Sequence, residues 1–168
     1  MDAKQLFQTA IVPGLLMLPP RMDSLNARAM LLAIAGQEGA FCQRRQMENG
    51  PARSPWQFEL GGVDGVATHP ASTVEYLNLA KALAYDPLPP PRAYVAIEFD
   101  LVLAAGIARL ALWRHPEPLP PRASMVDGWQ YYLRAWAPGM PRQQDWGRNW
   151  HTAWDIVTGV EAPPDRPE

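Results

Sequence analysis

Apolar side chains recur every three or four residues in several stretches of the chain, which is the repeat of an amphipathic helix. Polar and apolar residues nowhere alternate over enough positions to indicate a set of strands. Residues 101–112 are apolar on nearly every side, which is typical of a helix buried in the middle of a domain. The pattern predicts an all-α fold of five or six helices, with helical stretches at residues 24–41, 73–85, 92–113, 123–136 and 145–159.

Residues at the ends of these stretches favour helix starts and stops. Asp23 or Ser24 can cap the first helix, and Ser72 with Glu75 has the spacing of a capping box. Gly159 follows the final stretch, at the position where glycine commonly ends a helix.

Residues 43–70 interrupt the helical pattern, because glycine and proline are frequent there and no helical repeat can be traced. A loop of this length within a compact domain is usually functional or disordered, so we expect a long active-site loop. The Pro-rich tail at about residues 160–168 is expected to be loose. The whole chain, residues 1–168, is expected to form one domain.

Composition argues against several kinds of partner and environment. The formal net charge of -2 is too small to attract nucleic acid or an anionic membrane surface. The single cysteine, Cys42, cannot form an internal disulfide. No apolar run reaches the roughly 18 residues of a membrane span, and the apolar residues 11–18 contain Pro13 and Gly14 and precede no cleavage site. We therefore expect a soluble protein, made in the cytoplasm without a signal peptide.

A carboxylate lies on the apolar face of the first predicted helix. Glu38 continues the face formed by the apolar residues of the two preceding turns, and it falls in the last turn. Burial and the negative end of the helix dipole both disfavour an anion there, so we expect the pKa of Glu38 to be raised. A carboxyl group that keeps its proton near neutral pH can act as a general acid. The alternative is a helix-end side chain that reaches solvent or pairs with Arg44, Arg45 or Arg53.

Three short motifs occur in order along the chain. "QEGAF" ends the helix with Glu38 and Phe41, "SPWQ" follows in the loop at residues 54–57, and "RAWAPGMP" at residues 134–141 comes after the apolar helix. Their order and rough spacing resemble those of the lysozyme-like lytic transglycosylases and goose-type lysozymes, including their phage-encoded relatives. The resemblance covers about residues 28–155 and implies a lysozyme-like helical domain.

The chain departs from that family at three places. Gly39 stands where the family usually has serine, Ser-Pro at positions 54–55 replaces Gly-Leu, and Trp136 replaces a tyrosine. Because tryptophan has no phenolic hydroxyl, the hydrogen bond of the family's tyrosine is either absent or made by Tyr131 or Tyr132.

The resemblance implies cleavage of the bond between N-acetylmuramic acid and N-acetylglucosamine in peptidoglycan, with Glu38 as the acid. The family either lets the muramoyl 6-hydroxyl attack, which gives an anhydro product, or admits water. The hydrolytic route normally needs a second carboxylate at roughly 5 to 9.5 Å. Glu48, Glu59 and Asp64 are available on the loop, and Glu59 is preferred because it follows an aromatic-rich segment. The alternative for Glu59 is a solvated loop residue.

Five side chains are expected to contact the sugar. Gln57 would bond an acetamido group, although a loop amide bonded to the backbone is the alternative, and Trp56 and Trp136 would pack on sugar rings from a loop and a turn. Phe41 and Tyr132 complete the expected binding set. The tryptophans at helical spacing are expected in the core: Trp146, Trp150 and Trp154. The three scattered histidines have no ligand spacing, so we expect neither a metal nor a cofactor.

Peptidoglycan lies outside the cytoplasmic membrane, and the sequence has no visible export signal. This combination favours a phage protein that is made in the host cytoplasm, carried in the virion and active in the periplasm or cell wall. Its expected partners are glycan strands and other virion proteins. Two alternatives are a non-catalytic virion or tail component with the same fold and a sugar-binding module without turnover. The retained Glu38 favours the enzyme.

Overall fold

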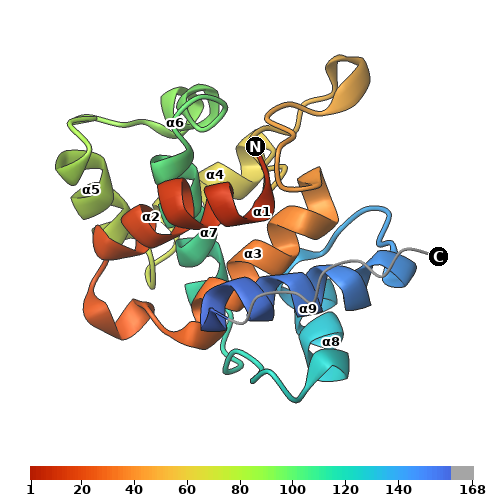
Figure 1. Cartoon of the computed structure of the whole chain (residues 1–168). Coiled ribbons are helices and arrows are strands. Elements are labelled where there is room, and N and C mark those ends of the chain that lie inside the picture. Colours follow the sequence, from red (N-terminus) through yellow and green to blue (C-terminus); the bar gives the residue numbers. More distant parts are fainter. Residues whose placement is uncertain (160–168) are drawn as a thin grey trace.

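The protein is built from helices, with no β-sheet among the residues that the structure describes (Figure 1). This computed structural model describes residues 1–159, so the tail at 160–168 lies outside the described residues. The all-α prediction is confirmed. The helices are α1 (Ala3–Leu6), a π-helical turn (Phe7–Ile11), α2 (Val12–Leu16), α3 (Leu25–Gly39), α4 (Leu60–Thr68), α5 (Thr73–Ala82), α6 (Pro90–Ala96), α7 (Leu101–Trp113), α8 (Met125–Trp136) and α9 (Gln143–Thr158).

Helix α3 is buried along most of its length and carries the site described below. The Ser24 hydroxyl accepts a hydrogen bond from the Ala27 amide at 3.1 Å, so Ser24 is the cap. Asp23 instead binds Arg28, at 2.6 and 2.8 Å. Every residue from 29 to 37 is buried, because α9 crosses one side of α3 and the N-terminal helices and α7 cover others (Figure 1).

Helix α7 is the central buried helix that the sequence predicts. The Asp100 carboxylate caps its first turn by accepting from the Leu103 amide at 2.9 Å, and residues 103–112 are all buried. The N-terminal helices pack closely against it. A Cβ atom on Gly14 would lie 2.8 Å from the carbonyl oxygen of Val102, so glycine sets this close approach.

Three local predictions are wrong, and each error has a physical cause. Residues 92–113 form two helices, because the chain turns before Asp100 and that side chain caps α7. The expected loop at 43–70 contains α4. The capping box is absent, since the Ser72 hydroxyl donates to the Val66 carbonyl at 2.6 Å while Glu75 binds Arg21 at 2.8 Å. Residues 1–159 consequently hold more helices than the five or six expected.

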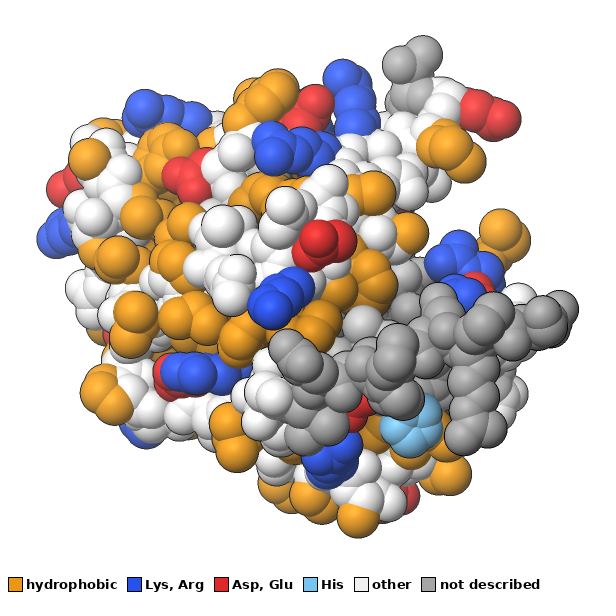
Figure 2. Space-filling model, in the orientation of Figure 1, with side chains coloured by type: hydrophobic (Ala, Val, Ile, Leu, Met, Phe, Trp, Pro, Cys, Tyr) orange, Lys and Arg blue, Asp and Glu red, His pale blue; other side chains and the backbone are white. Residues whose placement is uncertain are grey.

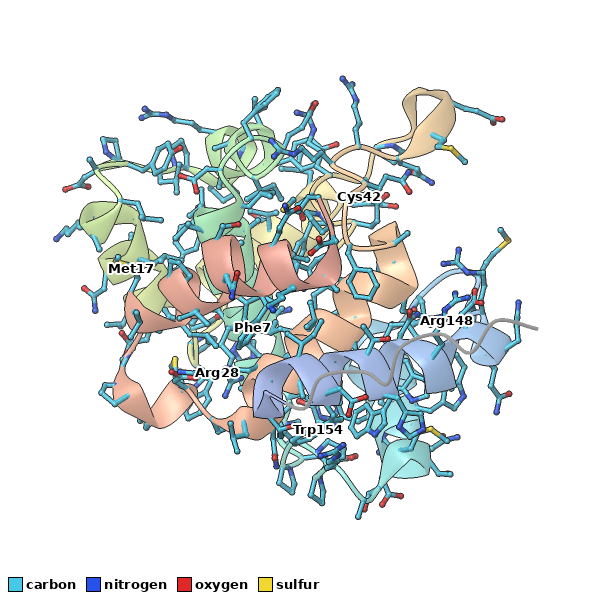
Figure 3. The ribbon with its side chains drawn as sticks, viewed as in Figure 1. Phe7, Met17, Arg28, Cys42, Arg148 and Trp154 are labelled. Carbon is cyan, nitrogen blue, oxygen red and sulfur yellow. The ribbon has the colours of Figure 1, made fainter. Side chains whose placement is uncertain are left out.

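Helices α8 and α9 share an aromatic layer. The stripe at helical spacing on α9 is buried as expected, with ring centroids 5.6 Å apart for Trp146 and Trp150 and 5.9 Å apart for Trp150 and Trp154 (Figure 3 labels Trp154). Tyr132 of α8 stacks on Trp146 at 5.3 Å. The layer fixes α8 against α9 and so fixes the position of Tyr132.

None of the helices within residues 1–159 has both the length and the apolar character that crossing a membrane requires.

Candidate active site

Glu38 lies where α3 ends and the chain reverses into the loop that follows. Ala40 and Phe41 both adopt left-handed backbone conformations, with φ of 45° and 65°, and the Phe41 amide donates to the Ala35 carbonyl at 3.1 Å. This bond satisfies a carbonyl group at the end of the helix. Cys42 marks the start of the loop beyond this reversal (Figure 3). The reversal leaves Glu38 half-buried at the edge of the core.

The loop returns to the end of α3 through a tight turn at residues 54–57. Arg53 and Phe58 close the turn with two backbone hydrogen bonds, of 2.9 and 2.8 Å. The Pro55 carbonyl comes so near to the helix that a Cβ atom on Gly39 would lie 2.7 Å from its oxygen. A serine at position 39 therefore does not fit beside this loop.

The Glu38 carboxyl group is held by Tyr132. The Tyr132 hydroxyl donates a hydrogen bond to Oε1 of Glu38 at 2.5 Å, and Oε2 accepts none from the described residues. Burial raises the pKa of Glu38, while the Tyr132 hydrogen bond and the positive charge of Arg142 partly oppose that rise. The expected direction of the shift is confirmed. Among residues 1–159 Glu38 forms no ion pair, and Arg53 pairs instead with Glu98 at 2.7 Å.

A buried polar network fixes the end of α3 against the start of α9. Oε1 of Gln37 accepts from the Asn149 amide at 3.0 Å, and Nε2 of Gln37 donates to the Arg142 carbonyl at 2.8 Å. The Arg142 guanidinium donates back to the Gln37 carbonyl at 2.6 Å and binds Asp145 at 3.0 Å. Gln37 and Asn149 are both buried. The network holds the residue next to Glu38 in place and keeps the Arg142 charge nearby.

A cleft of about 950 Å³ opens at this end of α3. Figure 2 shows a hollow between the loop that follows α3, at the upper right, and the loop that joins α8 to α9. We define the cleft floor as four of the lining residues that are buried or half-buried: Glu38, Ala52, Phe58 and Ala111. We define the cleft rim as four of the exposed lining residues, two from each loop: Met47, Glu48, Gly139 and Met140.

Three of the expected site residues lie in this cleft together with Glu38. Glu59 is exposed and precedes α4, and Trp136 lies at the end of α8 with its ring edge-to-face against Phe58, 5.1 Å between centroids. Gln57 lines the cleft, but its Nε2 donates to the Ser54 carbonyl at 2.7 Å. The amide of Gln57 is thus bonded to the backbone, as the alternative interpretation expected.

Three expected sugar contacts do not line the cleft: Trp56, Phe41 and Tyr132, of which Tyr132 is buried and hydrogen-bonds Glu38. The Trp56 side chain is 0% exposed, because its indole fills the space beneath the turn and donates from Nε1 to the Leu31 carbonyl at 2.9 Å. The Phe41 ring folds back over α3, where a Cβ atom on Gly36 would lie 2.5 Å from it. Trp56 and Phe41 both support the loop from below. The prediction that they bind the substrate is wrong for this arrangement.

The hydroxyl groups of the two tyrosines on α8 have different hydrogen-bond acceptors. Tyr132 bonds Glu38, whereas the Tyr131 hydroxyl donates to the Leu112 carbonyl at 3.2 Å.

Among the proposed second carboxylates, Glu48 and Glu59 line the cleft and Asp64 does not. Sequence reasoning missed Gln37 and Arg142, whose contacts join positions 105 residues apart.

Within residues 1–159, no group of three or more histidine, cysteine, aspartate or glutamate side chains is arranged to hold a metal ion. Comparison of the chain with protein-family models, with curated proteins and with solved structures found no match. The lysozyme-like resemblance therefore stays a prediction. What the geometry offers chemically is a half-buried carboxyl group with a raised pKa and a free oxygen, in a cleft that also holds two exposed carboxylates and an aromatic wall.

Proposed function

We propose that the protein cleaves peptidoglycan at the bond between N-acetylmuramic acid and N-acetylglucosamine, as a muramidase or lytic transglycosylase with Glu38 as the general acid. The observation that carries the proposal is the half-buried Glu38 carboxyl in the cleft floor, whose Oε2 accepts no hydrogen bond from the described residues. A raised pKa keeps a proton on such a group as the pH approaches neutrality.

The proposed chemistry uses the two oxygens of Glu38 differently. Tyr132 holds Oε1, so Oε2 is free to carry the proton that passes to the glycosidic oxygen as the bond to the muramic acid C1 breaks. In the transglycosylase route, the muramoyl 6-hydroxyl attacks C1 and its proton returns to Glu38. One carboxyl group then serves as acid and as base, and the product carries a 1,6-anhydro ring.

The hydrolytic route needs a second carboxylate to activate water or to stabilise the positive charge at C1. Glu59 is the preferred residue for that role, because it lines the same cleft as Glu38 from the start of α4. Trp136 offers an aromatic face for a sugar ring beside Phe58. The phage-encoded, virion-associated setting, with glycan strands and virion proteins as partners, is part of the proposal and rests on the sequence resemblance alone.

Mass spectrometry of purified peptidoglycan after incubation with the protein tests this function. The wild type should release soluble muropeptides, and Glu38→Gln should release none while its circular dichroism spectrum stays unchanged. Glu117→Gln is the matched control, because Glu117 is exposed and lies outside the cleft. Its activity should equal that of the wild type.

The ends of the released fragments separate the two routes. Anhydromuramic ends that persist in Glu59→Gln identify a transglycosylase, and reducing muramic ends that disappear in Glu59→Gln identify a hydrolase with Glu59 as its second carboxylate. Absence of fragments from folded wild-type protein, across several wall types, would contradict the enzymatic function. That outcome would favour the non-catalytic virion component.

A further inference from the structure

Arg114 is a cleft residue that the proposed chemistry does not use. It directly follows α7, it is half-buried, and it lines the cleft together with Glu38 and Ala111. The Arg114 guanidinium lies against α4. There a Cβ atom on Gly65 would lie 2.8 Å from Nη1 of Arg114, so the absent side chain of Gly65 makes room for the guanidinium.

The Arg114 guanidinium has no partner among residues 1–159. Its side chain forms no hydrogen bond and no ion pair there, and Nε is buried without an acceptor. Burial lowers the pKa of Arg114, which means that its positive charge is partly desolvated and not neutralised. A partly desolvated guanidinium without an anion carries a free-energy cost that a carboxylate bound at its Nη groups, which are not fully buried, would offset.

Three other guanidinium groups already have partners: those of Arg142, Arg53 and Arg109, which are exposed, half-buried and buried, respectively. Arg142 also lines the cleft, but it binds Asp145 and the Gln37 carbonyl. Arg53 has an unpartnered Nε as well, yet its Nη1 binds Glu98 at 2.7 Å. Arg109 donates to the Met22 carbonyl at 2.6 Å. Arg114 is thus the cleft cation of the described chain whose binding capacity is unused.

We propose that Arg114 binds a carboxylate carried by the muramic acid unit of the ligand, and that it distinguishes this sugar from N-acetylglucosamine. The inference rests on the proposed function for the identity of the sugar. A guanidinium presents parallel N–H donors that match the two oxygens of a carboxylate. Muramic acid differs from glucosamine by a lactyl group, so only the muramic unit brings a carboxylate, either the free lactyl group or a carboxyl group of an attached peptide.

Nuclear magnetic resonance of the Arg114 Nε–H group tests the proposal without any need for cleavage. The signal is assigned by its disappearance in Arg114→Gln, and the ¹⁵N-labelled wild type is titrated with N-acetylmuramic acid and, separately, with N-acetylglucosamine. We expect a saturable shift with the first sugar and none with the second at the same concentrations. Arg114→Gln should weaken the binding of N-acetylmuramic acid about tenfold, the loss expected for one charge-assisted hydrogen bond.

Two control variants exclude a general charge effect and a folding defect. Arg21→Gln makes the same change of charge at an exposed residue outside the cleft and should leave the affinity unchanged. Arg114→Lys keeps the charge without the planar fork and should bind with intermediate affinity. Both variants and Arg114→Gln are compared by thermal unfolding before titration.

A second ligand pair identifies the source of the carboxylate. Lactyl-amidated N-acetylmuramic acid should lose binding if the free lactyl group is recognised, whereas a muramoyl dipeptide with a free terminal carboxylate should keep it if the peptide is recognised. Equal shifts with both original sugars, no shift with any of these ligands, or unchanged affinity in Arg114→Gln would overturn the proposal. A shift at Arg114 in a protein that cuts no peptidoglycan would leave the carboxylate site standing and reject the proposed enzyme.

Discussion

The cleft floor and the cleft rim are built in opposite ways. The floor lies against the end of α3, where Gln37 and Asn149 bond each other in the core and Tyr132 bonds Glu38. The rim is formed by exposed loop residues, with Met47 77% and Met140 91% exposed among the described residues. The acidic group is therefore held in place before any ligand arrives, while the surface above it is free to adapt.

Under the proposed function, this difference would give separate tasks to the two regions. Proton transfer requires a carboxyl group at a fixed place with a raised pKa. The Tyr132 hydrogen bond holds Glu38 in place, and burial raises its pKa. Contact with a long, variable polymer gains from flexible side chains such as methionine. Substitutions in the floor should therefore change stability and protonation, and substitutions in the rim should change neither.

The largest effect is expected for a pair of tryptophans, one in the turn at residues 54–57 and one at the end of α8. Trp56→Ala removes a fully buried indole beneath the floor and should lower the free energy of unfolding by about 3–5 kcal/mol. Trp136→Ala removes a half-buried ring whose main aromatic contact is Phe58, and it should cost only about 1 kcal/mol. Urea unfolding of both variants measures the difference, and equal costs would contradict the assignment of Trp56 to the core.

The buried amide network should give the next largest effect. Gln37→Leu keeps the volume but leaves the Asn149 amide and the Arg142 carbonyl without their partner, at a cost of about 1–3 kcal/mol. Gln144→Leu, at an exposed site on α9, should change stability by less than about 0.5 kcal/mol. If chemical denaturation gives the two variants equal free energies of unfolding, the network does not hold the end of α3.

Glu38 itself should make the folded protein less stable as the pH rises. Its pKa is raised above 4.5 by burial, so between 4.5 and the folded-state pKa the folded protein binds more protons than the unfolded chain. Stability is lost across that window, and glutamine does not titrate. Unfolding of Glu38→Gln should therefore show a gain over the wild type that grows with pH.

Glu117 provides a control of opposite sign. Its hydrogen bonds to Arg134 lower the pKa of Glu117, so its contribution to stability is present above 4.5 and disappears as the pH falls. Glu117→Gln should therefore lose stability at neutral pH and match the wild type in acid. Because this pair is exposed, the change should be small. The same pH trend in both variants would contradict the assigned protonation of Glu38.

The smallest change is expected for Tyr132→Phe, which removes one hydroxyl group. The hydrogen bond from Tyr132 lowers the pKa of Glu38, so its loss should raise that pKa further, as measured by ¹³C resonance of the Glu38 carboxyl group. Tyr131→Phe removes a hydroxyl that bonds the Leu112 carbonyl and should leave the Glu38 titration unchanged. A downward shift in Tyr132→Phe would mean that the phenol does not stabilise the ionised carboxylate.

The sequence predicts the long helices because their apolar repeats are strong and extend over several turns. It misses α4, where Gly61, Gly62 and Gly65 give a low intrinsic helix propensity and the packing of buried Val63 and Val66 decides the outcome. The sequence pattern also fails to show the break between α6 and α7. Phe99 lies between Glu98 and Asp100 within an otherwise mostly apolar stretch, and it is exposed where Asp100 caps a new helix.

The candidate site is predictable only where a local pattern carries it. Glu38 is found from its place on an apolar face near a helix end, and the raised pKa follows from that place. Trp56 and Trp136 look alike in sequence, since each sits in a segment with proline, and only the folded loop separates core from cleft. Gln37 and Asn149 are 112 residues apart, so no spacing rule connects them.

Gly39 has a consequence for the ancestry of this site. Because the Pro55 carbonyl leaves no space for a Cβ atom at position 39, the end of the helix and the returning loop cannot change independently. A lineage that acquires serine there must also acquire a loop set farther back. Across related sequences, positions 39 and 55 should therefore vary together. The residue at position 39 would then indicate how closely the loop packs against the end of α3.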